Sequence, residues 1–407
     1  MSSSPVSLDG TSSIELKSYR EDSDFRALGL SEPWSRSYTL VYHYAHFKWW
    51  VTVTFQGEVY RHCTITKPQR RKDFAEFVRL IDYVSLTLLD DTVTEVILEE
   101  GFGAAGRKVK FIADTEASND LVTICNPFAL LIENGNLTYS IREDPQRVVY
   151  PSCDEFSLLR CIHMEDLVEE KEIKDGVFKV RSVSDGTPYI LKSIDQNMYF
   201  AEDTETIRHE LRNLQQFRGT PFIVQPVGIA VAPNPYQTLT TYGQSMVVTG
   251  ALVEYYSGGS LKNVLAENSL SQYADAWKRW PLQVATALHC LHEKGVAHMD
   301  IKPSNVVLDT NGNAILIDIS GSGAFTFDWL APELRGGSTL DEPSFEARRS
   351  NDIWAYGKLL LELTRHAEDS GFKRHVEQIA GCLMAESIHE RMSLVQAISE
   401  PTLAANS

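Results

Sequence analysis

The sequence contains no run of about 18 apolar residues of the kind that crosses a lipid bilayer. Its N-terminal segment, MSSSPVSLDGTSS, also lacks the apolar core of a secretion signal. Its six cysteines are spread along the chain without any CxxC spacing, which is typical of reduced thiols and not of a disulfide framework or a zinc site. These absences predict a cytoplasmic protein, with the nucleus as the alternative, and no membrane partner.

Positive charge is also scarce, because 38 Lys and Arg residues stand against 55 Asp and Glu residues, which gives a net charge of -17. An acidic chain repels phosphate backbones and anionic headgroups, so we expect no nucleic-acid partner. A site for any anionic ligand in this chain would need local cations or metal ions. The 407 residues, 43% of them hydrophobic, are enough for two or three globular domains.

The N-terminal part of the chain changes character near residue 38. Residues 1–37 are rich in Ser, Asp, Glu and Arg, which predicts a flexible tail. Residues 38–160 contain aromatic and β-branched runs typical of strands, together with one helical segment. This helical segment carries apolar residues in steps of three and four, at Phe74, Phe77, Ile81, Val84 and Leu88. We therefore expect a separate α+β domain, whose role the sequence does not indicate.

A literal GxGxxG lies inside this domain, at Gly101–Gly106. A dinucleotide-binding fingerprint needs a helix directly after the glycines, but residues 107–113 are strand-like. The segment is therefore interpreted as a hairpin turn and not as a nucleotide site.

Residues 168–398 show a second pattern. Short strand-like runs surround one helical segment, residues 204–217, and helical stretches dominate from Ser260 to Ser399. A β-rich half followed by an α-rich half predicts a two-lobed α+β domain with a cleft between its lobes. Residues 399–407 are expected to be a C-terminal tail.

The strongest chemical signal is the segment from His298 to Asn305, which is followed by an apolar run and, thirteen residues after Asn305, by Asp318. Phosphoryl transfer needs a group that accepts or orients a hydroxyl proton, and oxygen atoms that hold magnesium. Asp300 fits the first role, and Asn305 with Asp318 fits the second. Lys302 could neutralise charge on the moving phosphoryl group. A polar turn between two strands would explain one short piece of this pattern but not the ordered set.

These residues resemble the catalytic loop of eukaryotic-type protein kinases, with His298 and Asp300 in the HRD positions. The triplet at residues 318–320 resembles DFG, and residues 331–333 are an intact APE. Asp352 begins a segment similar to the helix buried under the catalytic loop, and Arg391 fits the partner of the APE glutamate. The resemblance covers residues 168–398. It implies transfer of the ATP γ-phosphoryl group to a protein substrate, with Mg²⁺ as the metal.

The same resemblance implies a set of nucleotide-binding residues: Gly176, Val177, Lys192, Glu210, Glu254 and Tyr256. Lys192 stands in the position of the lysine that grips the α- and β-phosphates, and Glu210, eighteen residues later, fits its ion-pair partner. The backbone of Glu254 and Tyr256 would bond adenine. Without the resemblance, Lys192 could equally be an exposed strand lysine, and Glu210 a solvated charge on a helix.

The hydroxyl acceptor is indicated by Thr326, five residues before Ala331. In serine/threonine kinases a threonine at this place bonds the catalytic aspartate and the lysine two residues after it. The resemblance therefore implies serine/threonine specificity.

The pattern is broken in several places. Lys171 and Ile173 occupy the first two glycine positions of the glycine-rich loop, Met299 replaces the HRD arginine, and Ser320 replaces the DFG glycine. These departures affect ATP affinity and regulation more than the chemistry. They leave two alternatives: a pseudokinase that acts as an interaction scaffold, and a small-molecule phosphotransferase of the aminoglycoside kind.

Overall fold

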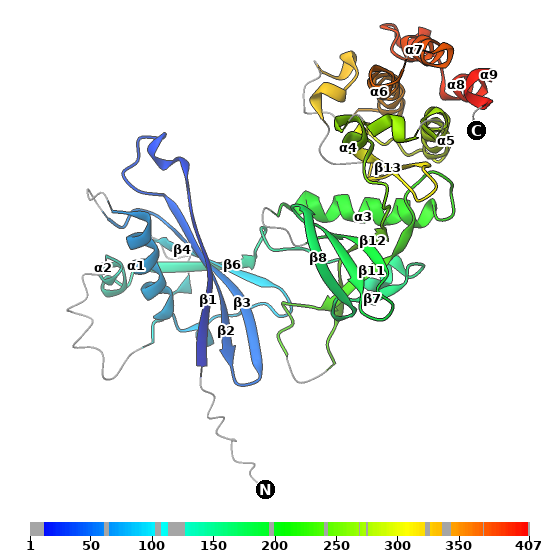
Figure 1. Cartoon of the computed structure of the whole chain (residues 1–407). Coiled ribbons are helices and arrows are strands. Elements are labelled where there is room, and N and C mark those ends of the chain that lie inside the picture. Colours follow the sequence, from blue (N-terminus) through cyan, green and yellow to red (C-terminus); the bar gives the residue numbers. More distant parts are fainter. Residues whose placement is uncertain are drawn as a thin grey trace. The chain divides into compact units, whose positions relative to one another are not determined.

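The computed structural model describes eleven stretches of the chain: residues 12–60, 65–101, 107–112, 127–194, 199–239, 243–267, 269–273, 276–321, 326–335, 343–368 and 370–405. The chain forms two compact units. The first comprises Met1–Arg147 and Pro233–Ser245, and the second comprises Val148–Ala232 and Met246–Ser407 (Figure 1).

The N-terminal unit is an α+β fold built on one six-stranded sheet. Its strands, in spatial order, are β1 (Ser12–Glu21), β2 (Ser35–Tyr44), β3 (Phe47–Gln56), β4 (Val93–Glu100), β6 (Leu137–Glu143) and β5 (Arg107–Lys108). Strands β3 and β4 are parallel, and α1 (Lys67–Arg79) connects them. A second, short helix is α2 (Ala129–Glu133). The core lies between α1 and the sheet, where the rings of Phe77 and Phe128 stack with centroids 4.5 Å apart.

The predicted flexible tail is wrong for residues 12–37, because β1 pairs antiparallel with β2 from Ser12 to Glu21. The apolar residues that β1 places against the core are Ile14, Leu16 and Tyr19. A register shift between Leu16 and Ser18 makes their spacing two and then three residues, which hides the alternation expected of a strand. Residues 1–11 lie outside the described part of the chain.

The predicted helix and domain boundaries also need correction. Helix α1 begins at Lys67 and ends at Arg79, so Val84, which is 63% exposed, does not belong to it. The N-terminal unit ends at Arg147 and not near residue 160. It also includes Pro233–Ser245, where Thr238 exchanges two hydrogen bonds with Asp91, each 2.8 Å long. Most of the predicted hairpin turn, residues 102–106, lies outside the described residues.

The C-terminal unit contains a second six-stranded sheet, followed by a helical part. The strands, in spatial order, are β7 (Cys161–His163), β11 (Pro226–Pro233), β12 (Met246–Glu254), β10 (Pro188–Ser193), β9 (Val177–Ser182) and β8 (Leu167–Lys174). One long helix, α3 (Ala201–Gln216), accompanies this sheet. A two-stranded sheet of β13 (Val306–Leu308) and β14 (Ala314–Leu316) follows.

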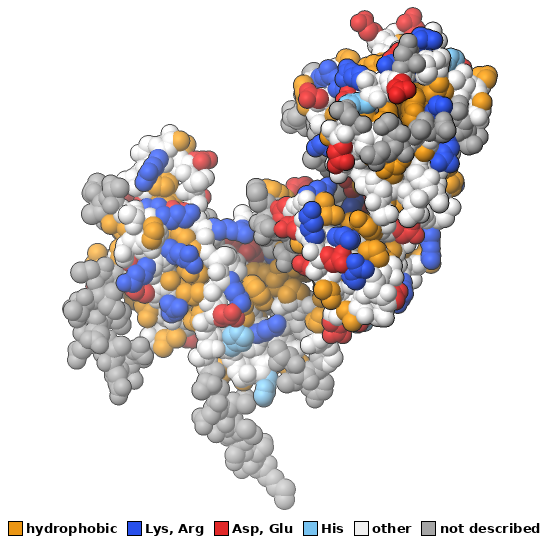
Figure 2. Space-filling view, in the orientation of Figure 1, with side chains coloured by type: hydrophobic (Ala, Val, Ile, Leu, Met, Phe, Trp, Pro, Cys, Tyr) orange, Lys and Arg blue, Asp and Glu red, His pale blue; other side chains and the backbone are white. Residues whose placement is uncertain are grey.

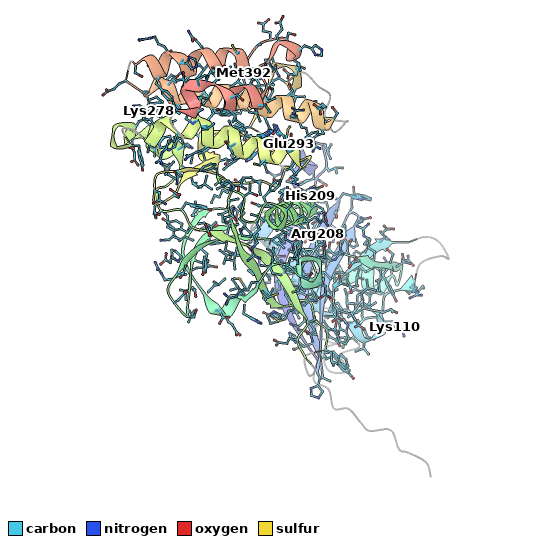
Figure 3. The ribbon with its side chains drawn as sticks, turned by 90° about the vertical axis from the view of Figure 1, so that its right-hand side faces the viewer. Lys110, Arg208, His209, Lys278, Glu293 and Met392 are labelled. Atoms are coloured by element: carbon cyan, nitrogen blue, oxygen red, sulfur yellow. The ribbon has the colours of Figure 1, made fainter. Side chains whose placement is uncertain are left out.

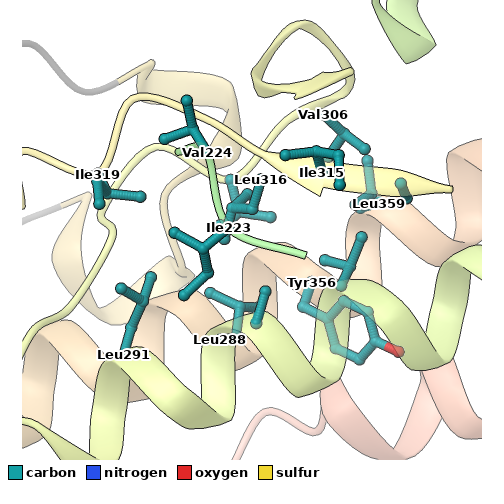
Figure 4. Packing of buried hydrophobic residues seen from close by; sticks show 14 of the residues in the cluster. Ile223, Val224, Leu288, Leu291, Val306, Ile315, Leu316, Ile319, Tyr356 and Leu359 are labelled. Atoms are coloured by element: carbon teal, nitrogen blue, oxygen red, sulfur yellow. The ribbon is translucent and has the colours of Figure 1, made fainter. Parts of the chain in front are cut away.

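The helical part consists of α4 (Leu261–Ala266), α5 (Trp280–Glu293), α6 (Phe345–Arg365), α7 (Gly371–Leu383), α8 (Leu394–Ser399) and α9 (Pro401–Ala404). Side chains of β13, β14, α5 and α6 pack together in its core (Figure 4). Tyr356 is fully buried there, and its hydroxyl donates to the carbonyl of Pro281 at 2.7 Å. The strand-rich part followed by the helical part confirms the predicted two-lobed architecture.

Two boundaries of this unit differ from the prediction. It begins before residue 168, because β7 pairs with β11 and Phe156 is fully buried in the core. Its end is not a free tail, because α9 places Leu403 in the same core with no exposed surface. Among the residues that the structure describes, no helix is long and apolar enough to cross a membrane.

Candidate active site

The C-terminal unit contains a cleft of about 770 Å³, lined by side chains from both its strand-rich and its helical parts. Eight residues predicted from the sequence line it: Val177, Lys192, Glu254, Tyr256, Asp300, Lys302, Asn305 and Asp318. Three predicted residues do not line the cleft but lie next to residues that do. Glu210 contacts Lys192, Thr326 contacts Asp300, and Gly176 precedes Val177 in the chain. Residues more than a hundred positions apart in the sequence therefore meet at one site.

The carboxylate of Asp300 is held by three neighbouring side chains. The ammonium of Lys302 lies 2.6 Å from its Oδ2, and the hydroxyl of Thr326 donates to its Oδ1 at 3.0 Å. Lys302 also donates to Thr326 Oγ1 at 2.8 Å, so the three residues form a closed triangle. The amide nitrogen of Asn305 donates to Asp300 Oδ2 at 2.9 Å and to its carbonyl at 2.8 Å. These contacts fix the orientation of the carboxylate.

Asp352, a fully buried residue of α6, binds the backbone just before Asp300. Its carboxylate accepts hydrogen bonds from the backbone nitrogens of His298, at 2.7 Å, and Met299, at 2.8 Å. The Nε2 of His292 lies 2.9 Å from the same carboxylate. Met299 has a φ of 68°, a left-handed conformation that residues other than glycine rarely adopt. The buried carboxylate therefore stabilises an unusual backbone turn next to Asp300.

The ring of His298 connects this loop to the segment that carries Asp318. Its Nδ1 accepts from the backbone nitrogen of Asp300, at 3.3 Å, so the proton of the neutral ring lies on Nε2. That Nε2 then donates to the carbonyl of Ile317 at 2.8 Å. His298 thus links the backbone of Asp300 to Ile317, the residue before Asp318.

Strand β10 and helix α3 bring Lys192 into contact with Glu210 and Asp318. The ammonium of Lys174 lies 3.7 Å from the other oxygen of Asp318. Burial alone would raise the pKa of the Asp318 carboxyl, but the charges of Lys192 and Lys174 hold this pKa well below its usual range. Burial also disfavours the charged form of Lys192, yet Asp318 and Glu210 raise its pKa. Both Lys192 and Asp318 are therefore charged at neutral pH.

The donor atoms at this end of the cleft fit Mg²⁺, which prefers oxygen ligands. Asp318 supplies a carboxylate. The amide nitrogen of Asn305 is used by Asp300, and its amide oxygen accepts one hydrogen bond of 3.4 Å from the Ser304 hydroxyl, which leaves a second lone pair for a ligand. Among the described residues, no group of three or more His, Cys, Asp and Glu side chains could hold a metal ion. One carboxylate and one amide suit a metal that takes its other ligands from phosphates and water.

One residue at the site was missed by the sequence reasoning. The amide of Asn213, on α3, donates to the carbonyls of Ile319, at 2.6 Å, and Ser320, at 3.3 Å. Asn213 follows Glu210 by three residues, so both lie on the same face of α3. That spacing is the signal that could have identified it. In Figure 3, Arg208 and His209 are labelled on the same helix.

Strands β8 and β9 stand where the glycine-rich loop was expected. Gly176, with a φ of 71°, forms the turn between them, and its carbonyl accepts from the backbone nitrogen of Ser193 at 2.7 Å. The side chains of Lys171 and Ile173 line the cleft, and Ile173 is 54% exposed. At the opposite wall, the backbone nitrogen of Glu254 donates to the carbonyl of Gln225 at 3.1 Å.

The segment after Asp318 is anchored at its far end by Arg391. Its guanidinium donates two hydrogen bonds to the carboxylate of Glu333, of 2.6 and 2.9 Å, as expected for the APE glutamate. A third bond, of 2.9 Å, goes to the hydroxyl of Ser350. A bidentate arginine–carboxylate pair fixes geometry as well as charge. Residues 322–325 and 336–342 lie outside the described residues.

Comparison with known proteins supports the same assignment. The protein kinase domain family matches residues 175–402, which is more than half of the chain. The "Probable LRR receptor-like serine/threonine-protein kinase RPK1" of Arabidopsis thaliana is 35% identical over 145 residues, 30% of this chain and 25% of that protein. The Arabidopsis "Serine/threonine-protein kinase AtPK1/AtPK6" is 25% identical over 283 residues, 66% of this chain and 56% of that protein.

The mouse "Serine/threonine-protein kinase Nek1" is 25% identical over 261 residues, 58% of this chain and 20% of that protein. The chain thus matches between 20% and 56% of the length of these three relatives. The family match, the two-lobed fold and the residues gathered in the cleft agree with one another. This chain belongs to the protein kinase domain family.

Proposed function

We propose that this chain is an active kinase, which transfers the γ-phosphoryl group of ATP to Ser and Thr hydroxyls of protein substrates with the help of Mg²⁺. The observation that carries this proposal is the triangle of Asp300, Lys302 and Thr326 in the cleft that also holds Lys192, Asn305 and Asp318. The triangle holds a carboxylate, an ammonium and a hydroxyl together in the cleft, and phosphoryl transfer needs a carboxylate that orients the acceptor hydroxyl.

Each residue of the site has a defined task in this proposal. The Asp300 carboxylate orients the acceptor hydroxyl and takes up its proton, while the Lys302 ammonium stabilises negative charge on the moving phosphoryl group. Lys192 holds the phosphates, and Asn305 and Asp318 hold the metal. When bound, Mg²⁺ neutralises charge on the phosphate oxygens.

The preference for Ser and Thr rests on Thr326, which bonds both Asp300 and Lys302. The printed names of the relatives described above, all serine/threonine kinases, support it. We expect phosphoserine and phosphothreonine in the products of the reaction. Phosphoamino-acid analysis of labelled substrate checks this, and mainly phosphotyrosine would contradict it.

Catalysis is tested by radiolabelled phosphate transfer from ATP with the full chain and with Asp300→Asn. We expect transfer by the wild-type chain and almost none by Asp300→Asn, because the amide cannot accept the proton. The matched control is Glu293→Gln, which makes the same chemical change at an exposed position at the end of α5 (Figure 3). If Asp300→Asn transfers phosphate at the wild-type rate, the assignment is wrong.

A second candidate function, a pseudokinase scaffold, is favoured by one observation. Lys171 and Ile173 put side chains into the cleft at positions where glycine would let the backbone approach the phosphates. A pseudokinase would show no phosphate transfer in the assay above. A thermal shift with and without Mg-ATP then shows whether such a scaffold still binds nucleotide.

A further inference from the structure

The walls of the cleft carry more positive than negative charge. Six lysines line it, at Lys171, Lys174, Lys179, Lys192, Lys262 and Lys302. They face three carboxylates, of which two are engaged: Asp300 by Lys302, and Asp318 by Lys192. Only Glu254 remains as an acidic side chain without one of these lysine partners. The cleft of an otherwise acidic chain is therefore basic.

Three of these lysines lie apart from the Asp300 and Asp318 contacts, and we call Lys171, Lys179 and Lys262 the cleft lysines. Lys171 stands opposite Lys179 in the pairing of β8 with β9. The ammonium of Lys179 lies 4.7 Å from the ring centroid of Tyr255, next to the expected adenine site, and 2.9 Å from Glu170. Lys262 belongs to the first turn of α4, in the helical part.

Two cleft lysines have no ion-pair partner in the described part of the chain. Among the residues that the structure describes, neither Lys171 nor Lys262 forms an ion pair. Lys and Arg side chains are exposed among acidic ones around β8 (Figure 2), and Glu170 offsets Lys179 there. Lys262 has no such acidic partner in the described stretches, so it is the cleft lysine whose charge is most available to a ligand.

A bound nucleotide does not account for Lys262. The phosphates of ATP would be met by Lys192 and by Lys174, which both lie close to Asp318. Lys262 lines the cleft from the opposite lobe, together with the neutral side chains of Ser260, Asn263 and Ser304. We call this part of the cleft, around Lys262, its rim. A substrate segment that reaches Asp300 must pass the rim, because Asp300 lines the same cleft.

At this rim, the positive charge of the nearby lysines acts on a peptide more strongly than the negative net charge of the whole chain. Charges further apart than the Debye length, about 8 Å at physiological ionic strength, are largely screened. The acidic surface elsewhere therefore repels an acidic peptide only weakly, whereas cations in the cleft contact it directly. A basic peptide would meet Lys262 and Lys302 and would find Glu254 as the single carboxylate not paired with a cleft-lining lysine.

We propose, on the basis of the proposed kinase activity, that the acceptor segment of the substrate is acidic, with Asp or Glu residues near the phosphorylated Ser or Thr, and that Lys262 selects it. Lys171 adds to the same field. Basic acceptor segments are disfavoured by the same residues.

The test uses the full chain and a set of Ser peptides in which each flanking position carries Asp, Glu, Ala, Lys or Arg. We expect the acidic peptides to have the highest kcat/KM, with a difference that shrinks as salt is raised. In Lys262→Glu, we expect KM for the best acidic peptide to rise about two- to fivefold, the size of an exposed ion pair, while KM for ATP stays the same. The control is Lys294→Glu, an equal charge change at an exposed residue outside the cleft.

The outcomes separate this inference from the proposed function. Phosphorylation of all peptides alike, or a preference for basic ones, overturns the acidic preference and leaves the kinase activity standing. A rise in KM for ATP instead of KM for peptide in Lys262→Glu also overturns it, because Lys262 would then serve the nucleotide. Phosphorylation of no peptide, with no stabilisation by Mg-ATP, removes the proposed function and this inference with it.

Discussion

The catalytic loop and the strands β8 and β9 line the same cleft but are built very differently. Around Asp300 the polar contacts are close: Asn305 and Thr326 hold the carboxylate, and buried Asp352 holds the backbone. On β8, Lys171 and Ile173 line the cleft at the positions where the resemblance to protein kinases predicts glycine. The residues needed for phosphoryl transfer and those that contact the nucleotide phosphates can therefore diverge separately. This difference leads us to expect an enzyme with intact chemistry and weak ATP binding.

The largest effects are expected from the two key carboxylates. Asp300→Asn and Asp318→Ala should each lower turnover, by about 10²–10⁴-fold for loss of the proton acceptor. The two variants should differ in binding, because Asp318 contacts Lys192 and is proposed to hold the metal, whereas Asp300 contacts Lys302 and is proposed to bind the acceptor. A thermal shift with Mg-ATP should persist in Asp300→Asn and vanish in Asp318→Ala. An unchanged shift in Asp318→Ala would contradict these roles.

The difference between the catalytic loop and strand β8 can be reduced by placing glycine at residues 171 and 173, in the double variant Lys171→Gly with Ile173→Gly. Glycine lets backbone amides approach the phosphates, and one well-placed electrostatic contact changes a rate by on the order of a hundredfold. We expect kcat/KM for ATP to rise toward that limit. Glu172→Gly is the matched control, since it adds glycine to the same strand at a residue that does not line the cleft. Equal gains in both variants would rule out the proposed cause.

The support of the catalytic loop is tested by Asp352→Asn. The carboxylate accepts from two backbone nitrogens, but an amide has one acceptor oxygen and would point donors at a donor. We expect the C-terminal unit to lose about 1–3 kcal/mol of unfolding free energy, measured by urea denaturation. The exposed Glu346→Gln on the same helix should stay within about 0.5 kcal/mol of wild type. Equal stability of both variants would show that the loop does not depend on Asp352.

The smallest effect is expected from removing phosphate groups. Met299 replaces the arginine that often binds a phosphate in the activation segment, and its sulfur lies 4.0 Å from the Asn351 amide nitrogen. A thioether cannot form a charge-assisted bond with phosphate. We therefore predict that phosphatase treatment causes no loss of activity, because the activity does not require a phosphate on Ser320, Thr326 or the undescribed Ser322. A large loss of activity after treatment would show that another basic group takes the arginine's place.

The sequence was most informative where chemistry fixes the spacing. Asp300, Lys302, Asn305 and Asp318 could be found because these polar residues keep a fixed order around apolar runs. The structure brings them together in one cleft. The pairing of Arg391 with Glu333 was likewise accessible, although 58 residues separate them, because both belong to motifs.

The sequence was least informative where long-range packing decides the structure. The bulge near Leu16 breaks the alternation of apolar and polar residues by which β1 could have been predicted. Leu403 is buried, although the sequence around it predicted a C-terminal tail. The hydrogen bonds between Thr238 and Asp91 join segments 147 residues apart, and no local sequence pattern predicts this contact. Local periodicity predicts elements but not which distant elements they contact.

The central expectation is active chemistry with a weak nucleotide grip, and an ATP titration of phosphate transfer tests it most directly. Initial rates would be measured for the full chain with Mg²⁺ and an acidic Ser peptide, beside Asp300→Asn. We predict measurable transfer that saturates only at high ATP, disappears in Asp300→Asn, and saturates at lower ATP in the double-glycine variant. No transfer by the wild-type chain or by the double-glycine variant at any ATP concentration would contradict the account.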